Sequence, residues 1–303
     1  MKQLIDQLSW EEFYKSSTKK KIIKKVEPFN RLIAHTKNYF LIGGYGAFTE
    51  GYVLIITKDF IPSYGLIEKI NNEELNFLIS IVKKMNIKKY KKSSVIFEHG
   101  MCACVGGLDR AHIHIMNISE KTTEDTLLSS INQTLYSRKV GIDSIEYKNY
   151  KLQNIHDINH FFENKEDYSE NEVKINGQIL KLEDIKNLNQ SQWPFVTLNH
   201  IQKGGHYVYF NSPYEKASFL TTNNFQTQFG REVVFYNEIK CNKKFKKKIE
   251  EFTKKNPHQE AWKWQNCMFE KNIISTVNGS KKFLKEDLII NKKNYQKYIY
   301  EVI

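Results

Sequence analysis

Over the first half of the chain, the hydrophobic residues follow the spacing of strands in some segments and that of a helix in another. Apolar runs at 38–46 and 51–58 end at glycine or lysine and predict two β-strands. Between residues 77 and 90, apolar residues recur at helical spacing, which predicts a helix. Two further runs, at 93–100 and 111–118, predict strands on either side of a glycine-containing loop. This order predicts an antiparallel α+β unit rather than alternating parallel units.

The second half of the chain has a less regular pattern. Residues 121–138 predict a helix, whereas the polar stretch from about 145 to 192 has little periodicity and indicates an insertion or a linker region. Apolar runs at 206–212 and 217–222 predict two more strands. The segment QTQFGREVVFYNEI predicts a helix, and the tail after it is expected to be mainly helical.

Length and composition fit a globular protein with one large domain or two ordinary ones. Of its 303 residues, 40% are hydrophobic and 13% aromatic, which is enough for a core and too aromatic for a disordered chain. No stretch approaches the roughly 18 apolar residues of a membrane helix, and the start does not resemble a secretory signal. We therefore expect a cytoplasmic protein without a membrane partner. Its expected parts are a helical lead-in at 1–25, an antiparallel domain at 26–145 and an accessory α+β region at 146–303.

The net charge of +12 comes from 46 basic and 34 acidic residues, and only four of the cations are arginine. Proteins that bind nucleic acids usually use the arginine fork to contact bases and phosphates. The lysine excess therefore indicates either a compositional bias or a field that steers anions. Arg110 and Arg231 are the more informative cations, because each falls in a distinctive motif.

The cysteines do not form a zinc motif. Cys102 and Cys104 are separated by one residue, whereas a zinc pair normally has two to four residues between its cysteines. Cys241 and Cys267 do not supply a matching second pair. We expect free thiols in a reducing compartment.

The segment FEHGMCACVGGLDRAHIHIMNI holds the strongest chemical signal. Alternate side chains of a strand share a face, so Arg110, His112 and His114 are expected to project to one side. The Gly106–Gly107 amides can approach a phosphate closely because no Cβ intervenes. Imidazole is also a nucleophile toward phosphorus when a neighbouring group fixes its tautomer. A cation and two imidazoles beside a glycine loop therefore predict an anion site.

Two other interpretations of these histidines stay open. Histidines two residues apart also occur on edge strands without any catalytic role. They can instead share a metal ion, which needs a third ligand, and His99 is the nearest candidate.

The same strand resembles the signature of the histidine-triad (HIT) family, His-φ-His-φ-His-φ-φ after a glycine loop, where φ is apolar. With Ile115–Met116 at the two trailing apolar positions, His112 matches the middle histidine and His114 the last. Arg110 stands in place of the first histidine. Upstream, GYVLIITK is similar to a family strand, with Tyr52 where the family usually has histidine. The resemblance covers about 29–118 and implies a HIT-like antiparallel sheet with flanking helices.

The resemblance also implies a mechanism. In HIT enzymes the middle histidine attacks the α-phosphorus of a nucleotide, and water or a second acceptor resolves the nucleotidyl-histidine. This implies that His112 is the nucleophile and that His114 contacts the phosphate or assists the leaving group. It further implies phosphate contacts from His99 and the Gly106–Gly107 amides, and a nucleoside pocket near the turn containing Gly44. The hydrolase branch requires no metal and no other cofactor.

Two departures from the family pattern bear on this mechanism. Arg110 has no acceptor nitrogen, so it cannot support the nucleophile as the first histidine does, but its fork can clamp a phosphate. The last position is His114 rather than the glutamine of the transferase and phosphorylase branches, which favours hydrolysis.

The C-terminal block carries a second resemblance. FQTQFGREVVFYNEI followed by WKWQNC resembles the region after the HIT-like domain in CwfJ-type proteins, which are associated with RNA processing. It is also similar to the C-terminal helices of larger bacterial HIT-like hydrolases. Arg231 is expected either to pair with Glu232 or to reach the nucleotide site, and Trp262 and Trp264 are core candidates.

The expected function is hydrolysis of a nucleotide phosphoanhydride or phosphoramidate at the α-phosphate, with a small nucleotide as substrate. One alternative is a nucleotidyltransferase or phosphorylase of the same superfamily. Another is a non-catalytic protein that binds a nucleotide or RNA, with RNA the less favoured partner. A homodimer is common among short HIT proteins and stays open, because the additional block can occupy the same sheet edge.

Overall fold

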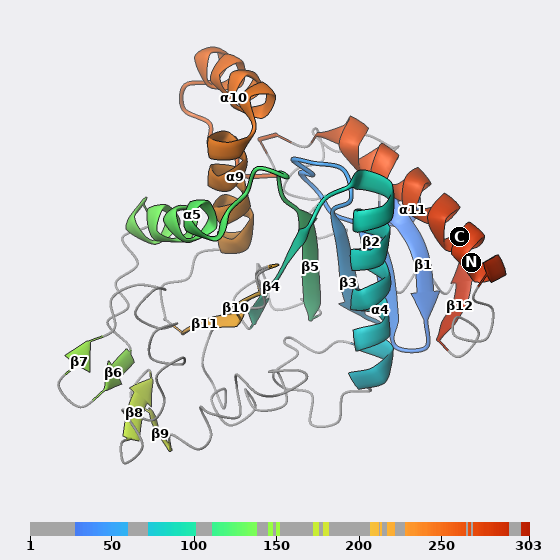
Figure 1. Cartoon of the computed structure of the whole chain (residues 1–303), viewed down its shortest axis with the longest axis horizontal. Coiled ribbons are helices and arrows are strands. Elements are labelled where there is room, and N and C mark those ends of the chain that lie inside the picture. Colours follow the sequence, from blue (N-terminus) through green and yellow to red (C-terminus); the bar gives the residue numbers. More distant parts are fainter. Residues whose placement is uncertain are drawn as a thin grey trace.

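The computed structural model describes residues 28–59, 72–100, 111–137, 145–147, 150–151, 172–175, 178–181, 207–211, 213, 217–221, 228–264, 266–267, 269–290 and 298–303. It has an α+β fold in which helices pack on an antiparallel sheet (Figure 1), so this part of the expected fold class is confirmed. The expected lead-in at 1–25 and the loop at 101–110 lie outside the described residues.

Eight strands form the main sheet, and each hydrogen-bonded pair of neighbours is antiparallel. The apolar runs of the sequence correctly predict β2 to β5, β10 and β11. The order across the sheet is β11 (Ala217–Thr221), β10 (Tyr207–Asn211), β4 (Ser94–Gly100), β5 (His112–Asn117), β3 (Val53–Thr57), β2 (Tyr39–Gly43), β1 (Leu32–Thr36) and β12 (Ile299–Val302).

A second, smaller sheet lies within the polar stretch that indicates an insertion or a linker. Its strands are short, which explains why the sequence pattern does not reveal them: β8 offers only the four residues Glu-Val-Lys-Ile for an alternation. The order is β7 (Tyr150–Lys151), β6 (Ile145–Tyr147), β8 (Glu172–Ile175) and β9 (Gln178–Lys181).

The helices follow the apolar periodicity of the sequence. The helix expected between residues 77 and 90 is confirmed, although it begins earlier and ends in a π-helical turn. The described helices are α3 (Pro28–Arg31), α4 (Asn72–Met85), the π-helical turn η4 (Asn86–Tyr90), α5 (Glu124–Ser137), α9 (Phe229–Cys241), α10 (Lys243–Lys255) and α11 (Glu270–Ile290).

One face of the sheet packs against α4 and α11. Gly43, Val53 and Ile115 are cross-strand neighbours and so share a face, and a Cβ on Gly43 would lie 2.8 Å from a valine side chain of α11. Helix α4 packs against β3 and β5, and its Lys84 pairs with Asp287 of α11 at 2.7 Å. The two helices therefore form one layer.

Strands from the accessory region extend both sides of the antiparallel unit. Strand β10 pairs with β4, and β12 pairs with β1. The β4 and β1 flanks are therefore occupied by strands that lie far away in the sequence. The main sheet is built jointly from the expected domain at 26–145 and the expected accessory region at 146–303.

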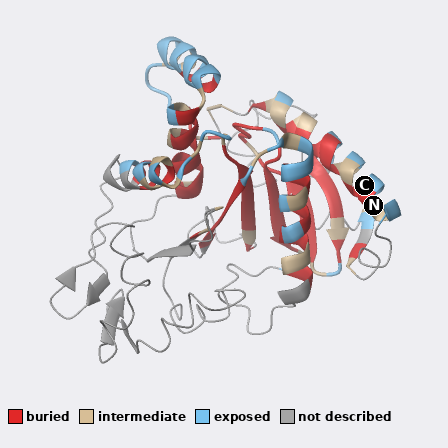
Figure 2. Cartoon of the chain, in the orientation of Figure 1, coloured by how far each residue is buried: buried red, intermediate tan, exposed pale blue. Residues whose placement is uncertain are grey.

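The core lies along the central strands (Figure 2). Strands β2 and β3 are buried at every position, which explains why their sequences are continuous apolar runs rather than alternating ones. Among the described helices, none combines the length and the apolar character that a membrane crossing requires.

Candidate functional site

Strand β5 carries His112 and His114 on the face opposite α4 and α11. Their ring centroids lie 4.8 Å apart, His114 is buried and His112 is partly exposed. His99 of β4 joins them, with its ring centroid 5.7 Å from that of His114. The fold thus gathers three of the predicted site residues, and strand alternation accounts for their common face.

The beginning of α9 lies against this histidine face. The backbone N–H of Gly230 donates to Nε2 of His99 at 3.1 Å, so a neutral His99 carries its proton on Nδ1. Phe97 stacks on His114, with ring centroids 4.5 Å apart, and a Cβ on Gly230 would lie 2.3 Å from the Phe97 ring. Glycine is therefore required here, because any side chain would separate α9 from the histidines.

Tyr52 lies immediately before β3 and fixes the tautomer of His114. Its phenolic oxygen is 2.6 Å from Nδ1 of His114. A protonated phenol has one O–H to donate, and Nδ1 of His114 is the hydrogen-bond partner of this oxygen among the described residues. The phenol O–H therefore donates to Nδ1, and the imidazole proton of His114 sits on Nε2.

Burial keeps both members of this pair uncharged at neutral pH. It lowers the pKa of His114 well below 6.5, and the neighbouring His112, His99 and Arg231 add to this effect. Burial also raises the pKa of Tyr52 to about 12, so the phenol retains its proton. Nε2 of His114 is buried and has no hydrogen-bond partner among the described residues. It is therefore an N–H donor without an acceptor among the described residues.

Gly44 acts on the site through Tyr52. Its N–H donates to the Tyr52 carbonyl at 3.0 Å, and a Cβ at this position would lie 2.4 Å from the Tyr52 ring. Gly46 has a φ of +65°, and a Cβ there would lie 2.4 Å from the Arg231 guanidinium. The turn that the HIT resemblance assigns to the nucleoside pocket thus supports the phenol that bonds His114.

Two buried arginines fasten this turn. Arg231 donates from Nη1 to the carbonyls of Tyr45 and Gly46 at 2.6 and 2.7 Å, and from Nη2 to that of Trp262 at 2.8 Å. Arg31 donates to the carbonyl of Gly43, and its guanidinium lies 3.5 Å from the centroid of the Tyr45 ring. Arg231, predicted as a substrate ligand, is thus placed to act through the turn and Tyr52.

A buried polar network holds the residues that follow the turn. Asn117, at the end of β5, donates to the Glu50 carbonyl at 2.7 Å and accepts from Ser94 at 3.0 Å. Asn86 donates to the Gly51 carbonyl at 3.1 Å and to Ser94 at 2.9 Å. Because these bonds join β5, β4 and η4 to the loop before β3, the position of Tyr52 is fixed from both sides.

The structure describes only some of the other predicted site residues. Arg110 and the Gly106–Gly107 amides lie outside the described residues. Within the described part of the chain, no three His, Cys, Asp or Glu side chains are grouped as a metal ion would need, so the metal interpretation with His99 gains no support there. The described cysteines, Cys241 and Cys267, are free thiols.

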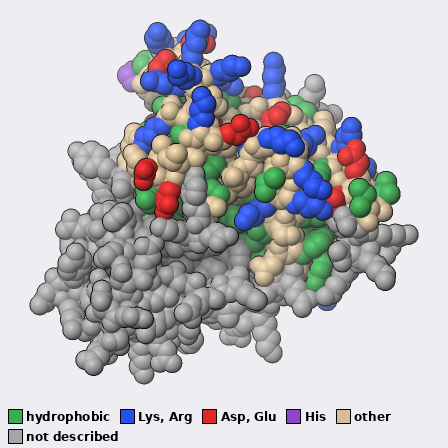
Figure 3. Space-filling model, viewed as in Figure 1, with side chains coloured by type: hydrophobic (Ala, Val, Ile, Leu, Met, Phe, Trp, Pro, Cys, Tyr) green, Lys and Arg blue, Asp and Glu red, His purple; other side chains and the backbone are tan. Residues whose placement is uncertain are grey.

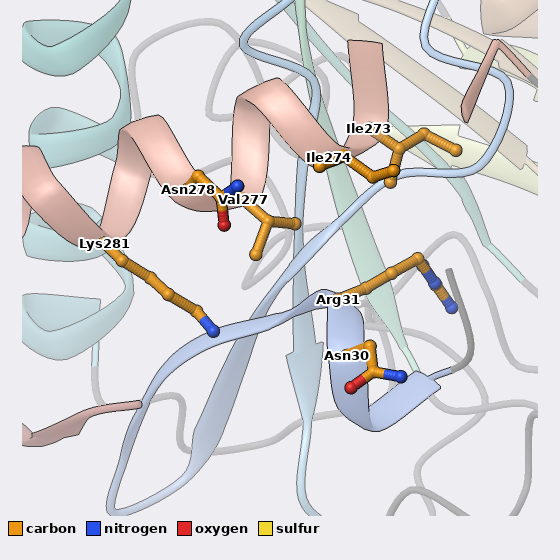
Figure 4. A pocket seen from close by; sticks show the side chains of 7 residues that line it. All are labelled: Asn30, Arg31, Ile273, Ile274, Val277, Asn278 and Lys281. Atoms are coloured by element: carbon orange, nitrogen blue, oxygen red, sulfur yellow. The ribbon is translucent and has the colours of Figure 1, made fainter. Parts of the chain in front are cut away.

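A cavity of about 560 Å³ opens between α3 and α11 (Figure 4). Helix α11 lies on the face of the sheet toward which a Cβ of Gly43 would point, whereas the histidines lie on the opposite face. The sheet therefore separates the cavity from the histidines. Its wall combines apolar side chains with amides and cations. The lining residues are Asn30, Arg31, Ile273, Ile274, Val277, Asn278 and Lys281.

Comparison with protein-family models finds no match, and comparison with curated protein sequences finds none either. The functional interpretation therefore rests on the residues themselves. In the sequence, Tyr52 stands out only as a replacement for a family histidine, without a role of its own. Tyr52 lies two residues before Leu54, which pairs with His114 across the two strands. This position is the signal that could have assigned Tyr52 a role.

Proposed function

We propose that this protein is a HIT-like nucleotide hydrolase that cleaves a phosphoanhydride or phosphoramidate at the α-phosphate. The observation that carries the proposal is the Nε2–H of His114, which has no partner among the described residues and lies beside the partly exposed ring of His112. An unpaired buried donor costs about 1–3 kcal/mol, so an acceptor such as a phosphate oxygen would be bound favourably there.

His112 is the proposed nucleophile. One of its ring nitrogens forms a bond to the α-phosphorus while the bond to the leaving oxygen or nitrogen breaks, and the leaving group takes the electron pair and then a proton from water. Water then attacks the phosphorus, the N–P bond returns its electrons to the imidazole, and a proton is released with the nucleoside monophosphate. The substrate supplies the nucleotide and the leaving group, and no further reactant than water is needed.

His114 and His99 are the proposed phosphate contacts. Neutral His114 donates its Nε2–H to a non-bridging oxygen, which matters most when negative charge builds up in the transition state. His99, whose Nε2 accepts from the Gly230 amide, is the second proposed contact. The beginning of α9 lies beside His99, and the positive end of its helix dipole favours an anion at this position.

A substrate panel with matched variants tests the proposal. Purified protein would be incubated with dinucleoside polyphosphates, nucleoside phosphoramidates and nucleotide sugars, and nucleoside monophosphate release would be followed by chromatography. We expect turnover of at least one class, and His112→Ala is expected to lower kcat/KM by about 1,000-fold or more. His258→Gln removes an exposed imidazole and is the control, with unchanged turnover.

Three outcomes would contradict the proposal. No turnover with any class removes the enzymatic function, and unchanged turnover in His112→Ala removes the nucleophile. Release that needs phosphate or a sugar phosphate, and fails in water alone, assigns the protein to the transferase or phosphorylase branch instead.

A further inference from the structure

Helix α10 is the most strongly basic element that the structure describes. Its 13 residues, KKFKKKIEEFTKK, contain seven lysines and two glutamates, a net charge of +5. All seven lysines are exposed, and Figure 3 shows basic side chains gathered on this projecting helix. Such a surface presents a polycationic face to solvent.

The apolar side of α10 is fully used in packing. Phe245 and Ile249 are buried, and Phe252 is partly buried. The Phe245 ring packs against Phe48 and Phe235, with centroids 5.7 and 5.8 Å away. The helix is therefore anchored to α9 and to the loop before β3, and its orientation is fixed.

At 3.6 residues per turn, six of the seven lysines fall into two rows on the solvent side. The first row faces directly away from Phe245, and the second lies on one flank; each has the spacing i, i+4, i+11. Within a row the first two lysines are about 6 Å apart along the axis and the last lies about 10 Å further on. The rows are Lys243, Lys247 and Lys254, and Lys244, Lys248 and Lys255.

The first turn of the helix carries unfavourable charge when no anion is bound. Lys243 and Lys244 stand in the first turn, where the helix dipole repels cations, and that turn has no acidic residue. The pairs of like charge at i and i+4 are unfavourable as well. Glu250, 4.0 Å from Lys246, interacts with a lysine outside both rows. A bound polyanion would relieve this repulsion.

We propose that α10 binds the phosphodiester backbone of a nucleic acid through its two lysine rows. A nucleic acid strand carries closely and regularly spaced charges, so it can meet several lysines of both rows at once. An anionic membrane fits less well, because α10 has no free apolar side chain to insert between lipids. This proposal is independent of the proposed hydrolase activity.

The test compares two triple variants of the full-length chain. Lys243, Lys247 and Lys254 are replaced by glutamine in one, and Lys83, Lys282 and Lys285 in the other. The second set consists of exposed lysines on α4 and α11, so both variants lose the same charge. Binding to fluorescent 20-nucleotide RNA and DNA single strands would be measured by anisotropy from 50 to 300 mM salt.

The α10 variant is expected to bind about 100-fold more weakly at 0.1 M salt. Its slope of log K against log salt should fall by about 2, since each lost phosphate contact removes about 0.7. The control variant should retain at least most of the affinity, and thermal unfolding should show that both are folded. Comparing the affinities for RNA and for DNA shows which of the two nucleic acids the helix prefers.

Several results would overturn the proposal. These are an equal loss in the two variants, no measurable binding to either strand, or a binding constant that does not depend on salt. Binding to phosphatidylserine vesicles or to polyglutamate that depends on the same lysines, without nucleic acid binding, would also overturn it. Hydrolase turnover is not a readout here, so failure of the two proposals can be told apart.

Discussion

Replacing Tyr52 by phenylalanine is the sharpest perturbation of the histidine cluster. It removes the phenol that donates to Nδ1 of His114 over 2.6 Å and leaves the ring in place. Nδ1 then becomes a buried acceptor without its partner, which costs about 1–3 kcal/mol. We therefore expect the free energy of unfolding to fall by about 2 kcal/mol.

The same substitution should change the tautomer of His114. In the wild-type protein the Tyr52 donor places the imidazole proton on Nε2, where it faces the proposed phosphate position. Without the donor, the Nδ1–H form becomes populated, and the share of molecules that can donate from Nε2 falls. Nitrogen chemical shifts of labelled histidine measure this ratio directly, and urea unfolding measures the loss of stability.

Tyr90→Phe provides a matched control. The Tyr90 hydroxyl is also buried, but it has no hydrogen-bond partner among the described residues, so its removal should leave the free energy of unfolding unchanged or slightly raised. Equal free energies of unfolding for the two variants, within about 0.5 kcal/mol, would refute the reasoning. An unchanged tautomer in Tyr52→Phe would refute it as well.

Three further predictions follow from the same cluster and its supports. The pKa of His114 in the folded protein lies below its unfolded value of about 6.5, so the unfolded chain binds the extra proton first as the pH falls. The free energy of unfolding therefore falls below about pH 6.5, by up to about 1.4 kcal/mol per pH unit. Urea unfolding against pH should show this component in the wild type and lack it in His114→Gln; parallel curves would contradict it. Gly44→Ala places a Cβ against the Tyr52 ring and should cost about 1–3 kcal/mol and cut hydrolase turnover, and an unaltered Tm would contradict this packing. Arg231→Lys replaces the two nitrogens of the fork by a single ammonium, which cannot reach the carbonyls that Nη1 and Nη2 bind separately. It should cost about 2–4 kcal/mol in urea unfolding, whereas a cost under about 0.5 kcal/mol would show that these bonds are dispensable.

Most of the sheet could be predicted because its strands are marked locally. Strands β2 and β3 are long apolar runs, and their burial on both faces explains that composition. The pairing of β10 with β4 and of β12 with β1 could not be predicted in the same way. These pairings join segments far apart in the chain, and hydrophobic periodicity does not report which segment a strand edge meets.

In the candidate site, too, local features could be predicted and contacts between distant segments could not. Alternation along β5 places His112 and His114 on one face, so that feature follows from the sequence alone. The contact between Gly230 and His99 spans 131 residues, and a backbone amide gives no sequence signal. Tyr52 shows a related limit, because a tautomer depends on which donors the fold brings to each ring nitrogen.

The most direct test of the central claim is rapid-quench mass spectrometry of the protein during turnover. We predict an adduct with the mass of one nucleoside monophosphate on the peptide that contains His112, formed and lost at rates consistent with kcat. The adduct should be absent in His112→Ala. Turnover without any adduct, or an adduct that persists in His112→Ala, would contradict a mechanism in which His112 carries the nucleotidyl group.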